Sequence, residues 1–260
     1  MAMKAEWYDS VWLNAYHAAS RVVARVAPHR HEEFVRAFDV LRTPPGFTPR
    51  HERGFLTLDQ LEQIRSIARA IPNDRMELHE MASFGRFVVH NLPEFTKLQH
   101  ELAATASDWA GQALEPCYNF LSLYTRMGAC EPHLDSPSAM WTLDICIEQS
   151  DPWPIWFSQN VPWPESAGAP DPDWATAIKN DPDLTFTPYV MEPGDAVLFS
   201  GSSQWHYREP LQAEGRKRFC NLLFLHYIPL GAGELLKPAN WPHLFGIPEI
   251  NEVPGLADAL

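Results

Sequence analysis

Two histidines and one aspartate are the residues of this chain whose types and spacing could hold a metal. His133 and Asp135 are separated by Leu134, and His206 follows much later, directly after Trp205. Residues two apart on a β-strand project from the same face, so His133 and Asp135 would point the same way. If His206 lies on a neighbouring strand, two imidazoles and a carboxylate converge on one side of a metal. This ligand set is typical of non-haem Fe(II) sites and leaves other coordination positions open.

Apolar segments around these three residues predict the strands that must position them. The segments 118–126, 140–147 and 216–228 are rich in β-branched, aromatic and other apolar residues, which is typical of buried strands. A Pro193-Gly194-Asp195 turn and the apolar run 196–199 precede His206. The order of strand, two ligands, strand, turn, strand, third ligand and final strand gives the short His-x-Asp motif the structural context that it needs.

Residues 118–228 resemble the iron(II)/2-oxoglutarate-dependent dioxygenase superfamily. The resemblance implies an α+β fold in which a double-stranded β-helix, a jelly-roll or cupin-like core, is flanked by N-terminal helices. It also implies that His133, Asp135 and His206 bind Fe(II) and form the catalytic centre. Two co-substrates follow from the same resemblance: 2-oxoglutarate, which chelates the iron, and dioxygen.

The resemblance further implies an arginine or lysine on the strand after the last histidine, where it binds the far carboxylate of 2-oxoglutarate. Arg216 and Arg218 both lie there, and residues i and i+2 share a strand face. Arg218 is favoured because the sequence that follows it resembles the family's strand better, but the choice stays open. A planar guanidinium suits a carboxylate because it donates two parallel hydrogen bonds. Tyr124 resembles a tyrosine that helps to hold 2-oxoglutarate in some members; an ordinary half-buried strand tyrosine is the equal alternative.

The chain reads as one domain, 1–260, with three zones. Residues 1–115 are predicted to be mainly helical and to buttress the core, with apolar residues at helical spacing and a Thr57/Gln60 capping box before one helix. Residues 116–228 form the predicted jelly-roll core. Its insertion 150–188 is rich in proline and tryptophan, and is interpreted as a lid or a loop anchored to the surface. The segment 229–260 is a predicted C-terminal tail that packs as loops over the barrel.

Net charge and sequence composition argue against nucleic-acid and membrane partners. A net charge of −13 and a pI near 5.2 disfavour a nucleic-acid partner, because phosphate binding relies on clustered lysine and arginine. We see neither a signal peptide nor an apolar run long enough to span a membrane, and the four cysteines show no disulfide spacing. A cytoplasmic protein without membrane partners is therefore expected; the oligomeric state stays open.

The reaction expected from the resemblance is hydroxylation of a small molecule with release of succinate and CO2. Retention of the carboxylate at Asp135 favours hydroxylation over halogenation, because family halogenases have a small residue there. Three alternatives stay open: a side-chain hydroxylase of proteins or peptides, a cupin-type metal protein that does not use 2-oxoglutarate, and a non-catalytic scaffold. Outside the triad, His226 is interpreted as a satisfied core or rim histidine, and Asp144 as a solvent-facing or ion-paired residue.

Overall fold

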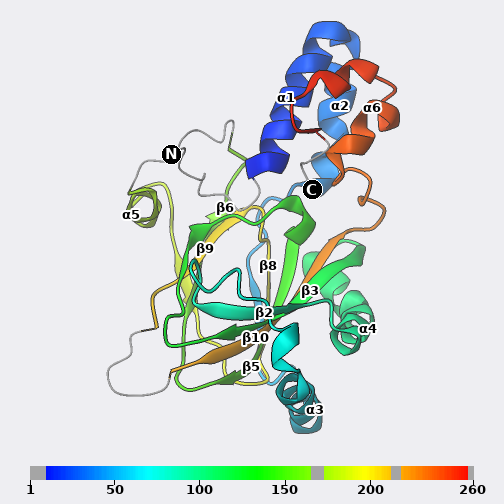
Figure 1. Cartoon of the computed structure of the whole chain (residues 1–260). Coiled ribbons are helices and arrows are strands. Elements are labelled where there is room, and N and C mark those ends of the chain that lie inside the picture. The colour runs from blue at the N-terminus through cyan, green and yellow to red at the C-terminus, as the bar shows by residue number, and fades with distance from the viewer. Residues whose placement is uncertain (1–9, 165–172, 212–217, 257–260) are drawn as a thin grey trace.

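Two stacked β-sheets with helices outside them make up the computed structural model, which describes residues 10–164, 173–211 and 218–256 (Figure 1). Along the chain, the helices are α1 (Ser10–Val26), α2 (His31–Ala37), α3 (Leu58–Ala70), α4 (Pro93–Ala110), α5 (Trp174–Lys179) and α6 (Trp241–Leu244). The strands are β1 (Arg50–Glu52), β2 (Arg86–His90), β3 (Leu114–Tyr124), β4 (Cys130–His133), β5 (Trp141–Gln149), β6 (Ile155–Asn160), β7 (Thr187–Tyr189), β8 (Ala196–Phe199), β9 (Gln204–Arg208) and β10 (Cys220–Pro229).

The larger sheet has six strands in the order β1-β8-β5-β10-β3-β2, and the smaller has four in the order β4-β9-β6-β7. Every pairing between these strands is antiparallel. Strands that follow one another in the chain alternate between the two sheets along much of 114–208, which is the winding of a jelly roll. The small sheet carries both predicted histidine ligands, on β4 and β9, and faces the inner side of the large sheet.

Alternation along the strands separates the core between the sheets from the layer outside them. On β10, Leu222 and Phe224 face the interior shared with the small sheet, whereas Leu223 and Leu225 face outward. The outward residues belong to a cluster that includes Leu61 and other apolar side chains of α3 and α4. Helices α3 and α4 therefore cover the outer face of the large sheet, which is the buttressing predicted from their apolar spacing.

Helix α3 begins as its sequence predicts. Thr57 accepts a hydrogen bond from the backbone N–H of Gln60, and the side chain of Gln60 accepts one from the backbone N–H of Thr57. This reciprocal capping box satisfies two N–H groups that the first turn of a helix leaves without partners.

Helices α1 and α2 do not join α3 and α4 on the outer face of the large sheet, where the whole N-terminal region was expected to pack. They form a separate cluster with the C-terminal segment, in which α6 and the short 3-10 helices Pro238–Asn240 and Pro248–Glu252 replace the predicted loops. Helices α1 and α2 and the C-terminal segment that contains α6 thus lie together beside the barrel (Figure 1). Burial of several large rings drives this packing; the rings are Trp12, Tyr16, Phe34, Phe38, Trp163, Trp241 and Phe245. We call this group the aromatic cluster.

The proline-rich insertion 150–188 contributes two strands to the small sheet. Strand β6 pairs with β9, where Phe157 lies opposite His206, and β7 pairs with the other side of β6. The prolines were expected to disfavour a continuous strand or helix, and the insertion forms short strands rather than one long element. Pro188 is tolerated on β7 because this is an edge strand, where one backbone N–H is not needed for pairing. The remainder of the insertion includes α5, and residues 165–172 lie outside the described residues.

No helix in the described ranges is both long and apolar enough to cross a membrane. The four cysteines are all free thiols.

Candidate metal and co-substrate site

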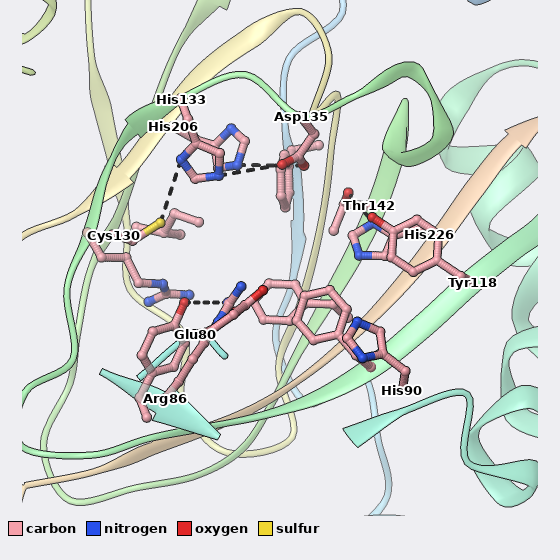
Figure 2. Close-up of a pocket in the computed structure, with 16 residues that line it drawn as sticks. Glu80, Arg86, His90, Tyr118, Cys130, His133, Asp135, Thr142, His206 and His226 are labelled. Carbon is pink, nitrogen blue, oxygen red and sulfur yellow. Dashed lines mark hydrogen bonds and ion pairs between the residues drawn. The ribbon is translucent and has the colours of Figure 1, made fainter. Parts of the chain in front are cut away.

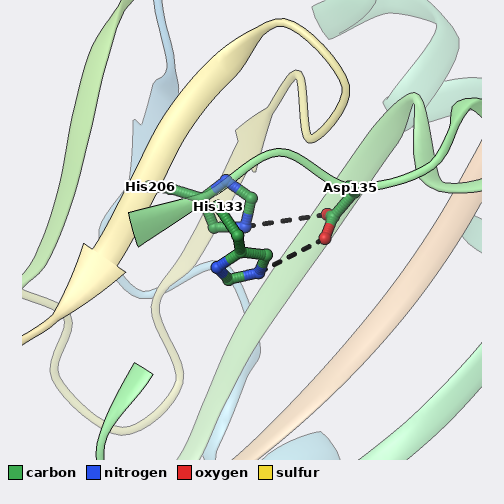
Figure 3. A group of neighbouring side chains, drawn as sticks. All are labelled: His133, Asp135 and His206. Carbon is green, nitrogen blue, oxygen red and sulfur yellow. Dashed lines mark ion pairs between the residues drawn. The ribbon is translucent and has the colours of Figure 1, made fainter. Parts of the chain in front are cut away.

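The three predicted ligands lie together at one end of the small sheet (Figure 3). His133 Nε2 is 3.5 Å from one carboxylate oxygen of Asp135, and His206 Nε2 is 3.7 Å from the other. One ligand atom from each residue can be chosen so that all lie within 4.8 Å of one another. His133 and His206 are also direct partners in the β4–β9 ladder, which places their side chains on the same face of the sheet.

Hydrogen bonds orient both imidazoles for metal binding. His133 Nδ1 donates to the backbone carbonyl of Glu131 at 2.8 Å, and His206 Nδ1 donates to that of Gln204 at 2.9 Å. We assign the proton to Nδ1 in each ring because a carbonyl oxygen can only accept. In the neutral form of each ring, Nε2 can then present a lone pair to an ion shared with Asp135, which is the usual way in which proteins fix the tautomer of a histidine ligand.

Asp135 reaches the site from just beyond the end of β4 rather than from the strand itself. Its backbone N–H donates to the carbonyl of Gly201 at 2.8 Å, which joins this loop to the turn between β8 and β9. A methyl group at Gly201 would overlap the Asp135 carboxylate and would lie 2.6 Å from the carbonyl oxygen of Ala139. The close approach of the carboxylate therefore requires glycine at 201, a residue that the sequence pattern does not single out.

Leu134, the residue between the ligands His133 and Asp135, anchors this part of the chain. Its side chain is fully buried in the aromatic cluster, on the opposite side from the metal ligands. Trp205, which precedes His206, is half-buried against the same cluster. The neighbours of two ligands are thus anchored in the helical layer while the ligands point into the barrel.

Charge and burial act against each other at the triad. Burial would raise the pKa of Asp135, but the charges of His206 and His133 and a hydrogen bond from His133 outweigh it and hold this pKa well below its ordinary value. Burial lowers the pKa of His206 to about 4. Burial would lower the pKa of His133 as well, but the neighbouring Cys130 and Asp135 outweigh it and raise this pKa to about 10, so His133 keeps its extra proton until a metal displaces it. A divalent metal requires an ionised carboxylate and neutral imidazoles, and its binding therefore releases that proton. The donor chemistry of the three residues therefore fits Fe(II) or a similar first-row ion.

A cavity of about 240 Å³ opens beside the triad, inside the barrel (Figure 2). Figure 2 shows His133, His206 and Asp135 along one wall, with Arg86 on the opposite side. Besides the triad, the lining residues that carry polar groups are Glu80, Arg86, His90, Tyr118, Tyr124, Cys130, Thr142, Arg208 and His226. They divide into an arginine end and a histidine end.

At the arginine end, the Arg86 guanidinium donates from Nη1 to the hydroxyl oxygen of Tyr124 at 2.7 Å and from Nε to Glu80. Burial raises the pKa of Tyr124, so this phenol keeps its proton. Because the phenol oxygen accepts from Arg86, its own hydrogen is directed elsewhere and can be donated to a ligand. The predicted Tyr124 therefore lines the cavity with a guanidinium beside it.

Arg208 supplies the second guanidinium at this end. It lies two residues after His206 on β9 and donates from Nη2 to Asp144 at 3.0 Å and from Nη1 to the carbonyl of Trp153. Burial raises the pKa of Asp144 to about 6 although the charge of Arg208 acts to lower it. Asp144 is thus ion-paired, the second of the two states expected for it, and is fully buried. His206 and Arg208 are two residues apart on one strand and therefore share a face, which was the sequence signal for this inward-facing arginine.

Of the two arginines predicted to bind the co-substrate, the structure describes only Arg218, and this residue does not line the cavity. Arg218 lies just before β10, with its guanidinium Nε 3.7 Å from Asp151. Arg216 lies outside the described residues. The positions of β10 that do face the interior are held by Cys220, Leu222, Phe224 and His226. Arg86 was missed because residues 1–115 were read as helical, which gave no inward face to a strand there.

At the histidine end, His226 is buried and lines the cavity beside Thr142 and Tyr118 (Figure 2). The expectation of a satisfied histidine was wrong, because its Nε2 has no hydrogen-bond partner among the described residues. The signal was present in the alternation of β10, which puts His226 on the same face as Leu222 and Phe224.

Solved structures of similar fold include a non-haem 2-oxoglutarate-dependent enzyme and proteins solved with 2-oxoglutarate bound. SnoK, a carbocyclase from nogalamycin biosynthesis, has a TM-score of 0.52 at 12% identity over 78% of this chain and 89% of its own. HygX from Streptomyces hygroscopicus, with nickel, 2-oxoglutarate and hygromycin B bound, has a TM-score of 0.51 at 14% identity over 77% of this chain and 88% of its own. EctD from S. alaskensis, with 2-oxoglutarate and 5-hydroxyectoine, has a TM-score of 0.51 at 13% identity over 76% of each chain.

No protein-family model matches the chain, and no curated protein matches its sequence. The likeness to solved structures is therefore one of fold. It confirms the predicted α+β class: the chain has the double-stranded β-helix fold of these 2-oxoglutarate-dependent enzymes.

Proposed function

We propose that this protein is an Fe(II)- and 2-oxoglutarate-dependent oxygenase that hydroxylates a small molecule. The observation that carries the proposal is the placement of the triad on the wall of an interior cavity that also contains an arginine–tyrosine pair. A metal site alone would fit many proteins. A metal site that shares a cavity with a buried guanidinium and a phenol fits a dicarboxylic co-substrate, whose far carboxylate needs hydrogen-bond donors.

His133, Asp135 and His206 would hold the iron on one face and leave the cavity side open for ligands. When bound, Fe(II) supplies the chemistry that couples oxygen activation and decarboxylation of 2-oxoglutarate, with release of succinate and CO2, to oxidation of the substrate. The protein's part is to fix the ligands through Glu131, Gln204 and Gly201 and to exclude bulk water.

Arg86 and Tyr124 are the groups that we assign to the far carboxylate of 2-oxoglutarate. The assignment is supported by the place of the Arg86 guanidinium, which lines the cavity with Nε donating to Glu80 and Nη1 donating to Tyr124. Tyr124 can donate its hydroxyl hydrogen to the same ligand. Both Nη atoms of Arg208 already donate hydrogen bonds, to the Trp153 carbonyl and to Asp144. We therefore assign Arg208 a positive charge near the co-substrate rather than a direct hydrogen bond to it. This assignment replaces Arg218, whose guanidinium contacts Asp151.

A small-molecule substrate is supported by the size of the cavity, about 240 Å³, and by the ligands of two structures with this fold. HygX was solved with hygromycin B and EctD with 5-hydroxyectoine. Hydroxylation is the proposed outcome because Asp135 keeps its carboxylate at the position that differs in halogenases.

The test is binding and turnover of 2-oxoglutarate by protein reconstituted anaerobically with Fe(II) and then exposed to oxygen. We expect Asp135→Ala to abolish succinate formation and to weaken metal binding. Arg86→Gln should weaken 2-oxoglutarate binding at least tenfold, because it removes a charge-assisted pair worth roughly 1.5–3 kcal/mol, while metal binding is retained. Arg218→Gln is the matched control and should behave as wild type.

The outcomes separate the alternatives. A protein that binds Fe(II) through the triad but does not bind 2-oxoglutarate would be a cupin-type metal protein. Loss of 2-oxoglutarate binding in Arg218→Gln but not in Arg86→Gln would return the anchor to the position first predicted. Metal binding that survives both Asp135→Ala and His133→Ala would contradict the whole assignment.

A further inference from the structure

His226 presents an unused hydrogen-bonding atom to the cavity. The residue lies on β10, is 3% exposed and lines the cavity at the end away from Arg86 (Figure 2). Its Nδ1 is 2.9 Å from the hydroxyl oxygen of Thr142, whereas Nε2 has no partner among the described residues. A buried polar atom without a partner has lost its hydrogen bonds to water and is unfavourable, so a ligand that supplies the partner gains binding energy there.

The contacts of Thr142 decide which tautomer His226 adopts. A hydroxyl carries one hydrogen, and Thr142 Oγ1 lies both near His226 Nδ1 and 3.4 Å from the carbonyl oxygen of Ala139. Both contacts are satisfied only if the hydroxyl donates to Ala139 and accepts from an N–H at His226 Nδ1. In that arrangement Nε2 carries no hydrogen and is an acceptor. Burial lowers the pKa of His226 to about 3, which agrees with a neutral ring.

Neighbouring rings hold His226 in this orientation. Tyr118 stacks on it with ring centroids 4.2 Å apart, and the Phe120 ring lies 5.4 Å away. These rings come from β3, whereas Thr142 comes from β5, so two strands of the large sheet fix the imidazole from different sides. Its acceptor atom is therefore preorganised before any ligand arrives.

The co-substrate cannot satisfy this acceptor. At neutral pH, 2-oxoglutarate has two carboxylates and a ketone, all of which only accept hydrogen bonds. Resting on the function proposed above, we propose that His226 Nε2 accepts a hydrogen bond from a hydroxyl or N–H group of the primary substrate and thereby positions it beside the metal. The substrate class is then a small molecule with such a donor, whose apolar part lies against the rings of Tyr118 and Phe120.

The experiment compares matched small probes in Zn(II)-loaded, 2-oxoglutarate-bound protein, with histidines labelled with ¹⁵N. Cyclohexanol carries a donor, and cyclohexyl methyl ether is similar in shape but carries none. We expect the His226 Nε2 resonance to report an unprotonated nitrogen, and to shift with cyclohexanol but not with the ether. His226→Phe keeps an aromatic ring and removes the acceptor, so it should bind cyclohexanol roughly tenfold more weakly and lose the preference over the ether.

His90→Phe is the control, because His90 also lines the cavity but its Nδ1 is bonded to Glu77 at 3.0 Å. This variant should keep the preference for cyclohexanol. A proton on His226 Nε2, the absence of any preference in wild type, or an unchanged preference in His226→Phe would each overturn the proposal. So would a loss of 2-oxoglutarate affinity in His226→Phe as large as that in Arg86→Gln.

The same experiment distinguishes failure of the proposed function from failure of the proposal for His226. If the wild-type protein does not bind 2-oxoglutarate, the oxygenase assignment falls. The tautomer of His226 and the alcohol preference are then measured in the Zn(II) protein alone, where the same outcomes support or overturn an acceptor role for His226.

Discussion

Gly201 controls the metal site through the space that it leaves. The Asp135 carboxylate occupies the volume where a side chain at 201 would begin, and the Asp135 backbone is bonded to the Gly201 carbonyl. A ligand displaced by a fraction of an ångström loses much of its contribution, because coordination distances vary little. Glycine is thus part of the metal site although it provides no ligand atom.

We expect Gly201→Ala to weaken Fe(II) or Co(II) binding at least tenfold while the chain stays folded. The added methyl group displaces Asp135 from His133 and His206. Titration of the apo protein with Co(II) measures the affinity, and circular dichroism checks the fold. Gly233→Ala is the matched control, because the nearest atoms to its new methyl group would lie 3.9 and 4.0 Å away. Equal metal affinity in the two variants would contradict this role for Gly201.

The neutral state of His226 also makes stability depend on pH. Burial lowers its pKa from 6.5 to about 3, and the opposing charge of Asp135 does not compensate. Between these values the unfolded chain binds a proton that the folded chain does not. The contribution of His226 is therefore complete above pH 6.5 and decreases as the pH falls, by up to about 1.4 kcal/mol per pH unit.

Urea unfolding of metal-free protein at pH 6.5 and 5.5 tests this effect. Wild type should lose about 1 kcal/mol more stability over this interval than His226→Phe. The comparison isolates His226, because every other titrating group is common to both proteins. Parallel losses in the two proteins would show that the buried imidazole is already protonated in the folded state.

At the scale of the elements, one buried ion pair joins the two sheets. Asp144 lies on β5 of the large sheet and Arg208 on β9 of the small sheet, and both side chains are at most 3% exposed. The pair crosses the interior close to the cavity. Its removal from one side leaves a charge in the barrel without its counter-ion.

Asp144→Ala should destabilise the fold by about 3–5 kcal/mol, because Arg208 then stays buried without its carboxylate. The double variant Asp144→Leu with Arg208→Met should lose much less, since apolar residues of similar size replace both charges. Equilibrium unfolding in urea measures both changes. A double variant as unstable as the single one would indicate that hydrogen bonds to other groups, rather than the uncompensated charge, dominate.

At the scale of the whole molecule, the aromatic cluster connects the N-terminal helices and the C-terminal segment to the loop of the metal site. Trp241 is fully buried there, with ring centroids 5.6 Å from Trp12 and 5.2 Å from Phe38. Leu134, between two of the metal ligands, is buried in the same cluster. The helical layer therefore supports the backbone of the His-x-Asp loop from outside the barrel.

We expect Trp241→Ala to cost about 3–5 kcal/mol of stability, as large-to-small changes in a core do, and also to weaken metal binding. Trp109→Ala is the control, because Trp109 packs on Phe55 in the layer of α3 and α4, a different apolar cluster from the one that contains Leu134. Thermal unfolding and Co(II) titration measure the two effects. Normal metal affinity in folded Trp241→Ala would show that the barrel alone positions the ligands.

The sequence by itself determined the fold class, the helices with strong apolar spacing, the cap at Thr57 and the three residues that the structure brings together as a metal site. Each of these depends on local pattern or on a short motif whose geometry is set by the strand period. The short strands within 150–188 were not predicted, because the effect of a proline depends on whether a strand is central or at an edge, and pairing partners decide that.

Only the tertiary structure decided which basic and polar residues face the cavity. Arg86, Arg208 and His226 come from strands far apart in the chain, and their convergence depends on the order of strands in the two sheets. Arg218 has the right residue type at about the expected spacing, yet it lies outside the cavity because β10 begins only at Cys220. Gly201 was hidden for the same reason: its importance lies in the space beside Asp135, and that space exists only after the loops have been brought together.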